Sequence, residues 1–129
     1  MDCLFCAIVD GDIPARRVYE DEHAIAFLDI NPWQLGHTLV IPRRHVDDVL
    51  APDRALGEIA PAIGATSRLL VERLRADGLN LLANAGATAG QEVFHLHVHL
   101  VPRYASQPGL RALFGRSEDD LDEVHAALR

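Results

Sequence analysis

The sequence contains no lysine, because all twelve of its basic residues are arginine. This absence excludes a P-loop lysine, a Schiff-base lysine and any other active site centred on lysine. Positive charge is scarce as well, since 19 acidic residues against 12 basic ones leave a formal net charge of −7. A chain of this charge disfavours sequence-independent binding to polyanions, so we expect no nucleic acid and no membrane among its partners.

Long apolar runs are also missing. No stretch approaches the roughly 18 uninterrupted apolar residues of a membrane span, and the first residues lack the basic and apolar regions of a secretory signal. We therefore expect a cytoplasmic protein. With 129 residues, 49% of them hydrophobic and 24% charged, the chain has the size and composition of a single domain over residues 1–129.

Cysteine is limited to Cys3 and Cys6, which form a Cys-x-x-Cys pair. In a reducing compartment this spacing indicates half of a zinc site or a redox dithiol, and two inert thiols are the remaining alternative. A thioredoxin-like motif needs a strand before its first cysteine, but only two residues precede Cys3. The zinc interpretation is therefore favoured.

Four short segments have the composition of strands: 23–30, 38–41, 79–83 and 94–101. Turn residues between the first two predict an antiparallel pair. Apolar residues at three- and four-residue intervals predict one long helix over 53–76, which Pro61 should kink or interrupt. A short helix is expected after Ser117, with Ser117 as its cap. The predicted fold class is α+β, an antiparallel sheet backed by the long helix.

Three histidines alternate with apolar residues in the last predicted strand, in the run His95-Leu96-His97-Val98-His99. Because side chains alternate across a strand, the imidazoles should project from one face at intervals of roughly 6.6 Å. A neutral imidazole is a nucleophile near pH 7, and a second one can hold a proton for a leaving group, which favours phosphoryl or nucleotidyl transfer. A catalytic zinc held by the histidines is the alternative, although the strand supplies no acidic ligand.

A loop of small residues over 84–91 precedes the histidines and contains Gly86 and Gly90. Loops of this kind allow backbone N–H groups to approach an anion closely. Taken alone, the loop is also typical of an ordinary connection. Beside three histidines it supports a phosphate site.

The run from Asn84 to Val101 resembles the signature of the histidine triad (HIT) family, in which three histidines alternate with apolar residues. Further stretches over 3–14, 26–30 and 36–45 are similar, in the same order, to the bacterial Hint branch. The resemblance covers about residues 3–104 and leaves 105–129 unplaced. It implies a HIT-like antiparallel sheet of about five strands, backed by one long helix and a short C-terminal helix, in a homodimer.

The resemblance also implies an enzyme that cleaves the P–N or P–O bond at the α-phosphate of purine nucleoside phosphoramidates or related nucleotides. The reaction would pass through a covalent nucleotidyl-histidine, without a catalytic metal. His97 would be the nucleophile, His99 would act at the phosphate oxygens or in proton transfer, and His37 would support the nucleophile. A dinucleoside polyphosphate hydrolase of the same family and a non-catalytic purine nucleotide-binding module stay as alternatives.

Binding residues are implied in the same way. Asp29 would accept hydrogen bonds from the ribose hydroxyls. The phosphate would be held by Asn84, Gln91 and the Gly90 backbone. Five apolar residues would enclose the base: Leu4, Phe5, Ile8, Phe27 and Ile30. A zinc ion would be held by Cys3, Cys6, His45 and His95, a closed ligand set typical of a structural site.

The remaining polar residues have less specific expectations. A carboxylate repels a phosphate, so Glu92 should point away from one or the local contact should differ. Three arginines are candidate partners for an anion: Arg43, Arg44 and Arg103. His23 and His125 match no pattern and are expected at the surface.

Overall fold

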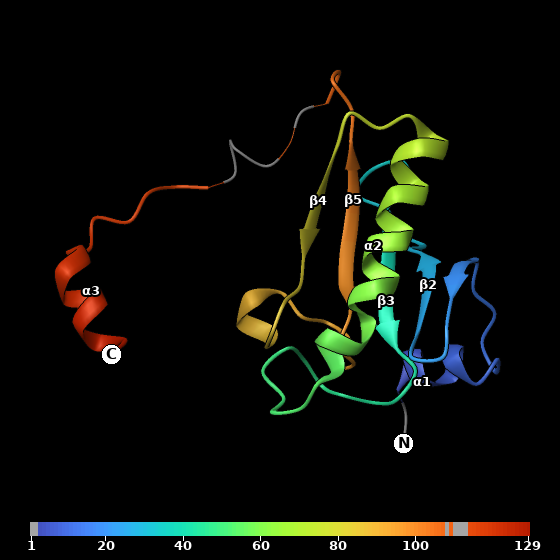
Figure 1. The fold of residues 1–129 in the computed structure, drawn as a ribbon, viewed down its shortest axis with the longest axis horizontal. Coiled ribbons are helices and arrows are strands. Elements are labelled where there is room, and N and C mark those ends of the chain that lie inside the picture. The colour runs from blue at the N-terminus through green and yellow to red at the C-terminus, as the bar shows by residue number, and fades with distance from the viewer. Residues whose placement is uncertain (1–2, 108, 110–113) are drawn as a thin grey trace.

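The structure, a computed structural model, describes residues 3–107, 109 and 114–129. At its centre lies an antiparallel five-stranded sheet in the order β1-β2-β3-β5-β4, and a long helix runs along one face (Figure 1). The strands are β1 (Arg17–Glu20), β2 (Ala24–Leu28), β3 (Thr38–Pro42), β4 (Gly78–Leu82) and β5 (Val98–Arg103). The helices are α1 (Leu4–Val9), α2 (Ala55–Leu74), the 3₁₀ turn η1 (Ala87–Ala89) and α3 (Leu121–Ala127). The expected α+β fold is confirmed.

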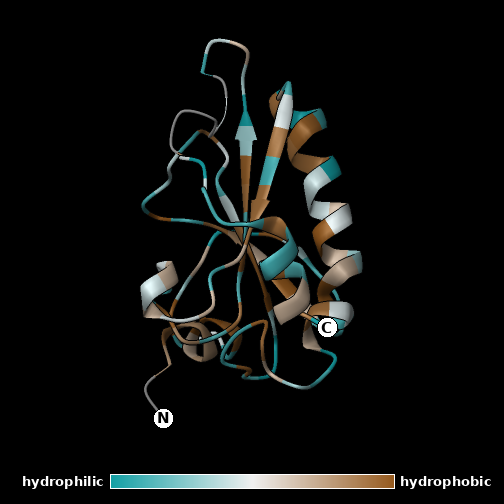
Figure 2. Cartoon of the chain, turned by 90° about the vertical axis from the view of Figure 1, so that its left-hand side faces the viewer, coloured by the Kyte–Doolittle hydropathy of each residue, from teal (hydrophilic) through white to brown (hydrophobic). Residues whose placement is uncertain are grey.

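The two faces of the sheet belong to two separate hydrophobic clusters, because successive side chains of a strand point to opposite faces. In β2, Ala24 and Ala26 join the cluster that packs against α2, whereas Ile25 and Phe27 join the one that packs against α1. Apolar residues recur along α2 at helical intervals, with hydrophilic residues between them (Figure 2). The face next to α1 carries the functional side chains described below.

The predicted strand over 94–101 is correct only in its second half, because β5 begins at Val98 and continues to Arg103. The preceding segment runs beside the loop that follows β3, where the Leu96 amide donates to the Val46 carbonyl at 2.6 Å. The alternation nevertheless extends through this segment, since Leu96 is buried in the same cluster as Val98. Strand β1 and helix α1 were not predicted.

Two further local predictions are contradicted, namely an interruption of the long helix at Pro61 and the cap of the C-terminal helix. Helix α2 continues through Pro61 without interruption; the carbonyl that loses its partner there belongs to Gly57, which is exposed to water. Helix α3 is capped by Asp120 and not by Ser117, because the Asp120 carboxylate accepts from two backbone amides of the first turn. Every residue of α3 is exposed, and the helix lies apart from the sheet (Figure 1).

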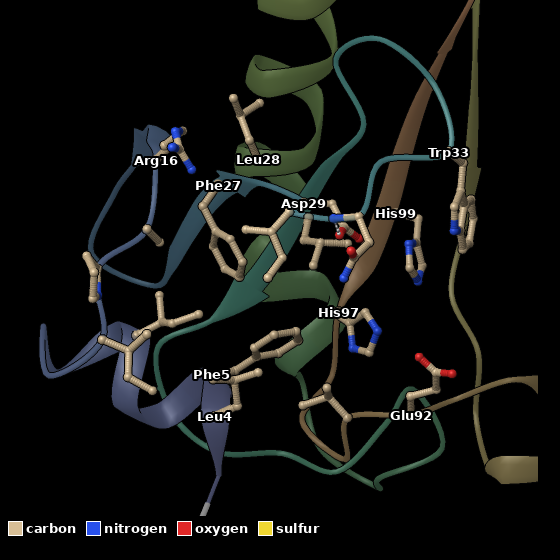
Figure 3. Close-up of a pocket in the computed structure, with 18 of the residues that line it drawn as sticks. Leu4, Phe5, Arg16, Phe27, Leu28, Asp29, Trp33, Glu92, His97 and His99 are labelled. Atoms are coloured by element: carbon tan, nitrogen blue, oxygen red, sulfur yellow. Dashed lines mark hydrogen bonds between the residues drawn. The ribbon is translucent and has the colours of Figure 1, made fainter.

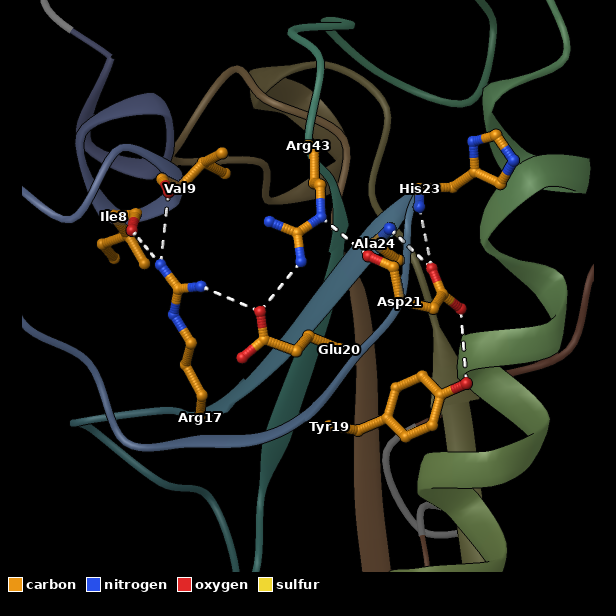
Figure 4. Close-up of polar contacts among 9 residues, drawn as sticks. All are labelled: Ile8, Val9, Arg17, Tyr19, Glu20, Asp21, His23, Ala24 and Arg43. Atoms are coloured by element: carbon orange, nitrogen blue, oxygen red, sulfur yellow. Dashed lines mark hydrogen bonds and ion pairs between the residues drawn. The ribbon is translucent and has the colours of Figure 1, made fainter.

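An arginine network fastens α1 to the sheet (Figure 4). Arg17 of β1 donates to the carbonyls of Ile8 and Val9 at 2.7 and 3.2 Å. Glu20 accepts from Arg17 at 3.4 Å and from Arg43 at 2.9 Å. The network holds α1 against the strand edge, where it forms one wall of the cavity described below. Within the described part of the chain, no helix is long and apolar enough to cross a membrane.

Candidate active site and metal-binding cluster

The three histidines of the triad do not share one environment. His97 and His99 line a cavity of about 420 Å³, whereas His95 lies with the two cysteines, and the Phe5 ring contacts both His95 and His97. All three are buried, with exposed fractions of 0% for His95, 7% for His97 and 6% for His99. The triad therefore divides between the cavity and the cysteine cluster.

The His97 ring is oriented by its own backbone neighbourhood. Its Nδ1 lies 2.8 Å from the His95 carbonyl, which only an N–H can satisfy, so Nδ1 carries the proton. The edge of the Phe5 ring contacts the imidazole, with centroids 5.1 Å apart at 90°. In this tautomer Nε2 keeps its lone pair, and it is the nitrogen of His97 that is able to act as a nucleophile.

His99 is held by a hydrogen-bonded chain from the β2–β3 loop. The Trp33 amide donates to His37 Nδ1 at 3.0 Å, so the proton of a neutral His37 is on Nε2. That nitrogen lies 2.9 Å from His99 Nδ1 and donates to it, which leaves the His99 proton on Nε2. His37 was expected to support His97, but it contacts His99 instead. The Trp33 indole stacks on His99 with centroids 4.6 Å apart at 14°.

Both imidazoles of this chain are neutral near pH 7. Burial, together with the neighbouring His97 and His37, lowers the pKa of His99 to about 4, although Asp29 opposes the shift. Burial also lowers the pKa of His37, against the opposing charge of Asp29. A neutral His99 presents an N–H donor without adding a positive charge to the cavity.

The expected nucleotide-binding residues mostly line this one cavity. Asp29 lies at the end of β2, where its Oδ1 accepts from the Asn31 amide at 2.8 Å and its Oδ2 lies 3.6 Å from His37 Nε2. The cavity wall also contains all five residues expected around the base, together with Asn84 and Gly90: Leu4, Phe5, Ile8, Phe27 and Ile30. Leu4, Phe5 and Phe27 lie on the side away from His99 (Figure 3).

The loop over 84–91 differs from its expectation. The amides of Gly90 and Gln91 donate to the carbonyls of Ala87 and Gly86 at 3.0 and 3.1 Å, so they are not free for an anion. The Gln91 side chain is buried and also fully used. Its Oε1 accepts from the Gly86 amide at 2.8 Å, and its Nε2 donates to two backbone carbonyls. Gln91 therefore braces the loop, and it is absent from the cavity wall.

The charged residues are also placed differently from the expectation. Glu92 lines the cavity, and its carboxylate lies on the side of His97 and His99 (Figure 3). The three candidate arginines have other partners, namely Glu20 for Arg43, Asp53 and Glu58 for Arg44, and Asn80 for Arg103. Of the arginines in the described ranges, only Arg16 lines the cavity. The two histidines that match no pattern, His23 and His125, are exposed, as expected.

Cys3, Cys6, His45 and His95 come together beside the cavity, with one donor atom of each within 4.8 Å of all the others. His95 Nδ1 lies 3.4 Å from Cys3 Sγ and 3.5 Å from Cys6 Sγ, and His45 Nδ1 lies 3.4 Å from Cys6 Sγ. A tetrahedral zinc with bonds of about 2.0–2.3 Å separates its ligands by about 3.3–3.8 Å. The cluster has the dimensions of such a site.

The hydrogen bonds around the cluster fit the same interpretation. His95 Nε2 donates to the Pro42 carbonyl at 2.8 Å, and His45 Nε2 donates to Asp47 at 2.8 Å. Each imidazole therefore turns an unprotonated Nδ1 toward the sulfurs, as metal-ligating histidines do. Burial, reinforced by Cys3, raises the pKa of the Cys6 thiol to about 11. A divalent cation is the partner that would stabilise both sulfurs as thiolates.

Two residues of these sites, Trp33 and Asp47, were not predicted from the sequence. Trp33 contacts His37 and His99 from a loop, and its one available signal was that it is the only tryptophan of the chain. Asp47 supports His45 from two positions further along. The one indication in the sequence was its position two residues after His45, but an Asp near a His at the surface commonly has no such role.

Comparison with known proteins agrees with this geometry. The HIT domain family model matches residues 10–106. A crystal structure of SMU.412c from Streptococcus mutans is similar, with 46% identity, 98% of this chain and 81% of that chain covered, and a TM-score of 0.89. A Zn-bound histidine triad family protein from Mycobacterium smegmatis is 45% identical, with 92% and 85% coverage and a TM-score of 0.78. Adenylylsulfatase HINT3 of Arabidopsis thaliana is 38% identical over 79% of this chain and 52% of its own length.

Proposed function

The chain belongs to the HIT domain family, and from this premise we propose that it hydrolyses purine nucleotides at the α-phosphate with His97 as the nucleophile. The preferred substrates in this proposal are nucleoside phosphoramidates, in which a P–N bond is cleaved. The adenylylsulfatase among its relatives supports a reaction at the phosphorus of an adenylyl group.

One observation carries the proposal. The His95 carbonyl fixes the proton of His97 on Nδ1, and this leaves the Nε2 lone pair of a cavity residue free to react. His99 lies beside it, with ring centroids 5.0 Å apart, and its proton is fixed on Nε2 by His37. A lone pair and a donor next to each other are what attack at phosphorus and stabilisation of a phosphate oxygen require.

The reaction has two steps. In the first, His97 Nε2 forms a bond to the α-phosphorus, the P–N bond breaks, and the leaving nitrogen departs as an amine after taking up one proton from the solvent. In the second, water attacks the phosphorus, the bond to Nε2 breaks, and the water gives up one proton. The water's proton passes to the solvent, the nucleoside monophosphate leaves, and both imidazoles return to their initial state.

The cavity suits a mononucleotide. Its volume of about 420 Å³ falls within the range of small-ligand sites. In the proposed pose the base packs against Phe5 and Phe27, and the ribose hydroxyls donate to the carboxylate of Asp29. Because the amides of the 84–91 loop are used internally, we assign the phosphate to the side chains of Asn84 and His99.

The test replaces His97 by alanine. Turnover of adenosine 5′-phosphoramidate should fall by roughly 10⁴-fold, while AMP binding by calorimetry persists. His125→Ala removes an exposed histidine from α3 and should behave as the wild type. Intact-mass spectrometry of the quenched wild-type reaction should detect the nucleotidyl adduct. Retained turnover in His97→Ala overturns the proposal, and AMP binding without turnover or adduct in the wild type supports a binding module instead.

We also propose that the cluster of Cys3, Cys6, His45 and His95 holds a structural Zn²⁺. The Zn-bound relative and the ligand spacing support this assignment. Bound there, the ion would crosslink the start of α1 to the segment before β5 and would leave no position for a catalytic water. His95 would then position the carbonyl that orients His97, and the chemistry would remain with His97 and His99.

A homodimer is the assembly we propose. Strand β4 is an edge of the sheet, and Leu81 on it is 54% exposed. An edge strand with an exposed apolar side chain is a site at which a second copy can pair. Light scattering should give twice the chain mass, and Leu81→Lys should shift the protein toward the monomer.

A further inference from the structure

The cavity has two chemically different sides, with His97 between them (Figure 3). On one side lie Leu4, Phe5 and Phe27, which provide an apolar surface for a base. On the other side lie Trp33, His99 and Glu92. In an in-line attack by His97 the leaving group departs on the side opposite the nucleophile, and the base and ribose already occupy the apolar side. The side with Trp33 and Glu92 therefore remains for the leaving group.

Trp33 presents an aromatic surface on this side. One face of its indole stacks on His99, yet the residue remains 54% exposed. Its amide donates to His37, and its ring contacts both His37 and His99, so these contacts hold the indole in place. A fixed indole face attracts a cation by its quadrupole and also packs against an alkyl chain.

Glu92 adds a negative charge to the same side. Its side chain is exposed and lines the cavity, and no ion pair with another described residue neutralises it. Asp29 is a second carboxylate of the cavity wall. The single lining arginine within the described residues, Arg16, lies at the far end, beyond Phe27 (Figure 3). The surroundings of His97 and His99 are therefore negative.

We infer that Glu92 and Trp33 select the leaving group by its charge, and that this enzyme favours amine leaving groups carrying a second, positively charged group. This inference rests on the proposed function and assigns a specificity to the same site. A leaving group of this class is an aminoalkyl chain joined to the α-phosphorus through one nitrogen and ending in an ammonium. Leaving groups with a carboxylate or a phosphate are disfavoured, because Glu92 and Asp29 repel them.

The experiment compares adenosine phosphoramidates whose N-linked chains have one length and end in an ammonium, a methyl or a carboxylate group. For the wild type we expect kcat/KM to fall in that order, with a ratio of roughly 30-fold between the cationic and the anionic substrate at low salt. The ratio should shrink as salt is added, since the carboxylate is exposed.

Two variants assign the effect to residues. Glu92→Gln should reduce the cation-to-anion ratio by roughly tenfold, and Trp33→Leu should reduce the preference for the ammonium over the methyl chain by roughly threefold. Glu72→Gln removes the same charge from an exposed position of α2 and should leave the ratio unchanged. Glu92 is exposed, so its replacement does not threaten the fold.

The outcomes separate the two proposals. Equal kcat/KM for the three chains, or a ratio that Glu92→Gln leaves unchanged, overturns the assignment of charge selection while turnover itself still supports the proposed function. Failure of the wild type to turn over any of the three, or the unsubstituted phosphoramidate, overturns the proposed function and this inference with it.

Discussion

Two groups of histidines lie on the same side of the sheet, and both have ligand atoms close enough to hold a metal ion. In the first, His45 and His95 each donate their distal N–H to an oxygen and turn a lone pair toward the cysteines. In the second, the Trp33 amide occupies His37 Nδ1, so His37 Nε2 carries a proton. A metal at His37 Nε2 would require an imidazolate, which is not available near neutral pH.

The partner of one ring nitrogen therefore decides what the other nitrogen of an imidazole can do. An oxygen acceptor makes the other nitrogen a ligand or a nucleophile, as for His95 and His97. A donor, such as the Trp33 amide, makes the other nitrogen an N–H donor, as for His37. Changes to these partners should therefore affect the two groups of histidines differently.

Removing the sulfur ligands should have the largest effect. In the double variant Cys3→Ala and Cys6→Ala, we expect zinc content to fall to zero and the free energy of unfolding to drop by about 5 kcal/mol relative to the zinc-loaded wild type. Thermal denaturation and metal analysis measure both. Wild type stripped by a chelator should unfold near the same temperature as the double variant, and a stable, zinc-loaded double variant would contradict the assignment of the cluster.

Acid should destabilise the folded protein through the second group, which contains His37 and His99. The pKa of His99 is lowered to about 4, so between pH 6.5 and 4 the unfolded chain binds a proton that the folded protein does not. The contribution of His99 to the free energy of unfolding is therefore fully present above pH 6.5. It is lost as the pH falls toward 4, and the total loss is about 3 kcal/mol. Urea unfolding with chelator present throughout should show this slope, and His99→Gln should flatten it. Greater stability at pH 5 than at pH 7 would be the contrary result.

Gly36→Ala disturbs the second group without changing a histidine. Gly36 has φ +89°, and an added Cβ would collide with the Leu74 side chain and approach Pro102 Cγ to 3.1 Å. We expect a loss of about 2 kcal/mol in unfolding free energy and a lower kcat, because the next residue is His37. Gly57→Ala, in a helix with open space around it, should be neutral or stabilising. Wild-type stability in Gly36→Ala would refute the collision.

The smallest effect is expected at the acceptor of His45. Asp47→Asn weakens the acceptor of the His45 Nε2 proton, and zinc affinity should fall by roughly tenfold. Competition with a chromophoric chelator measures the change. Glu72→Gln removes one negative charge elsewhere and serves as the control; an equal loss of affinity in both variants would indicate a general charge effect rather than support of the ligand.

Much of the fold was predictable because it depends on local periodicity. The long helix and four of the five strands follow from apolar spacing, whereas β1 was missed because it is only four residues long and has a charged residue at each end. The residues around the cavity were named from the family resemblance, and most of them do line it. The Gly90 amide was misassigned because its acceptor, the Ala87 carbonyl, lies within the same loop. The Gln91 side chain was misassigned because it bonds to the Gly86 amide and to the carbonyls of Val93 and the distant Asp47, and a sequence pattern does not show which polar groups are already used.

The alternation that separates the histidines from the hydrophobic cluster under α2 follows from the sequence alone, since that separation needs only the period of an extended chain. The role of each histidine depends on contacts that form only in the folded chain. The roles depend on the Pro42 carbonyl, the Asp47 carboxylate and the Trp33 amide, and the first of these is 53 positions from its imidazole. A proton sits on one ring nitrogen or the other according to such contacts, and folding alone brings the distant one into place.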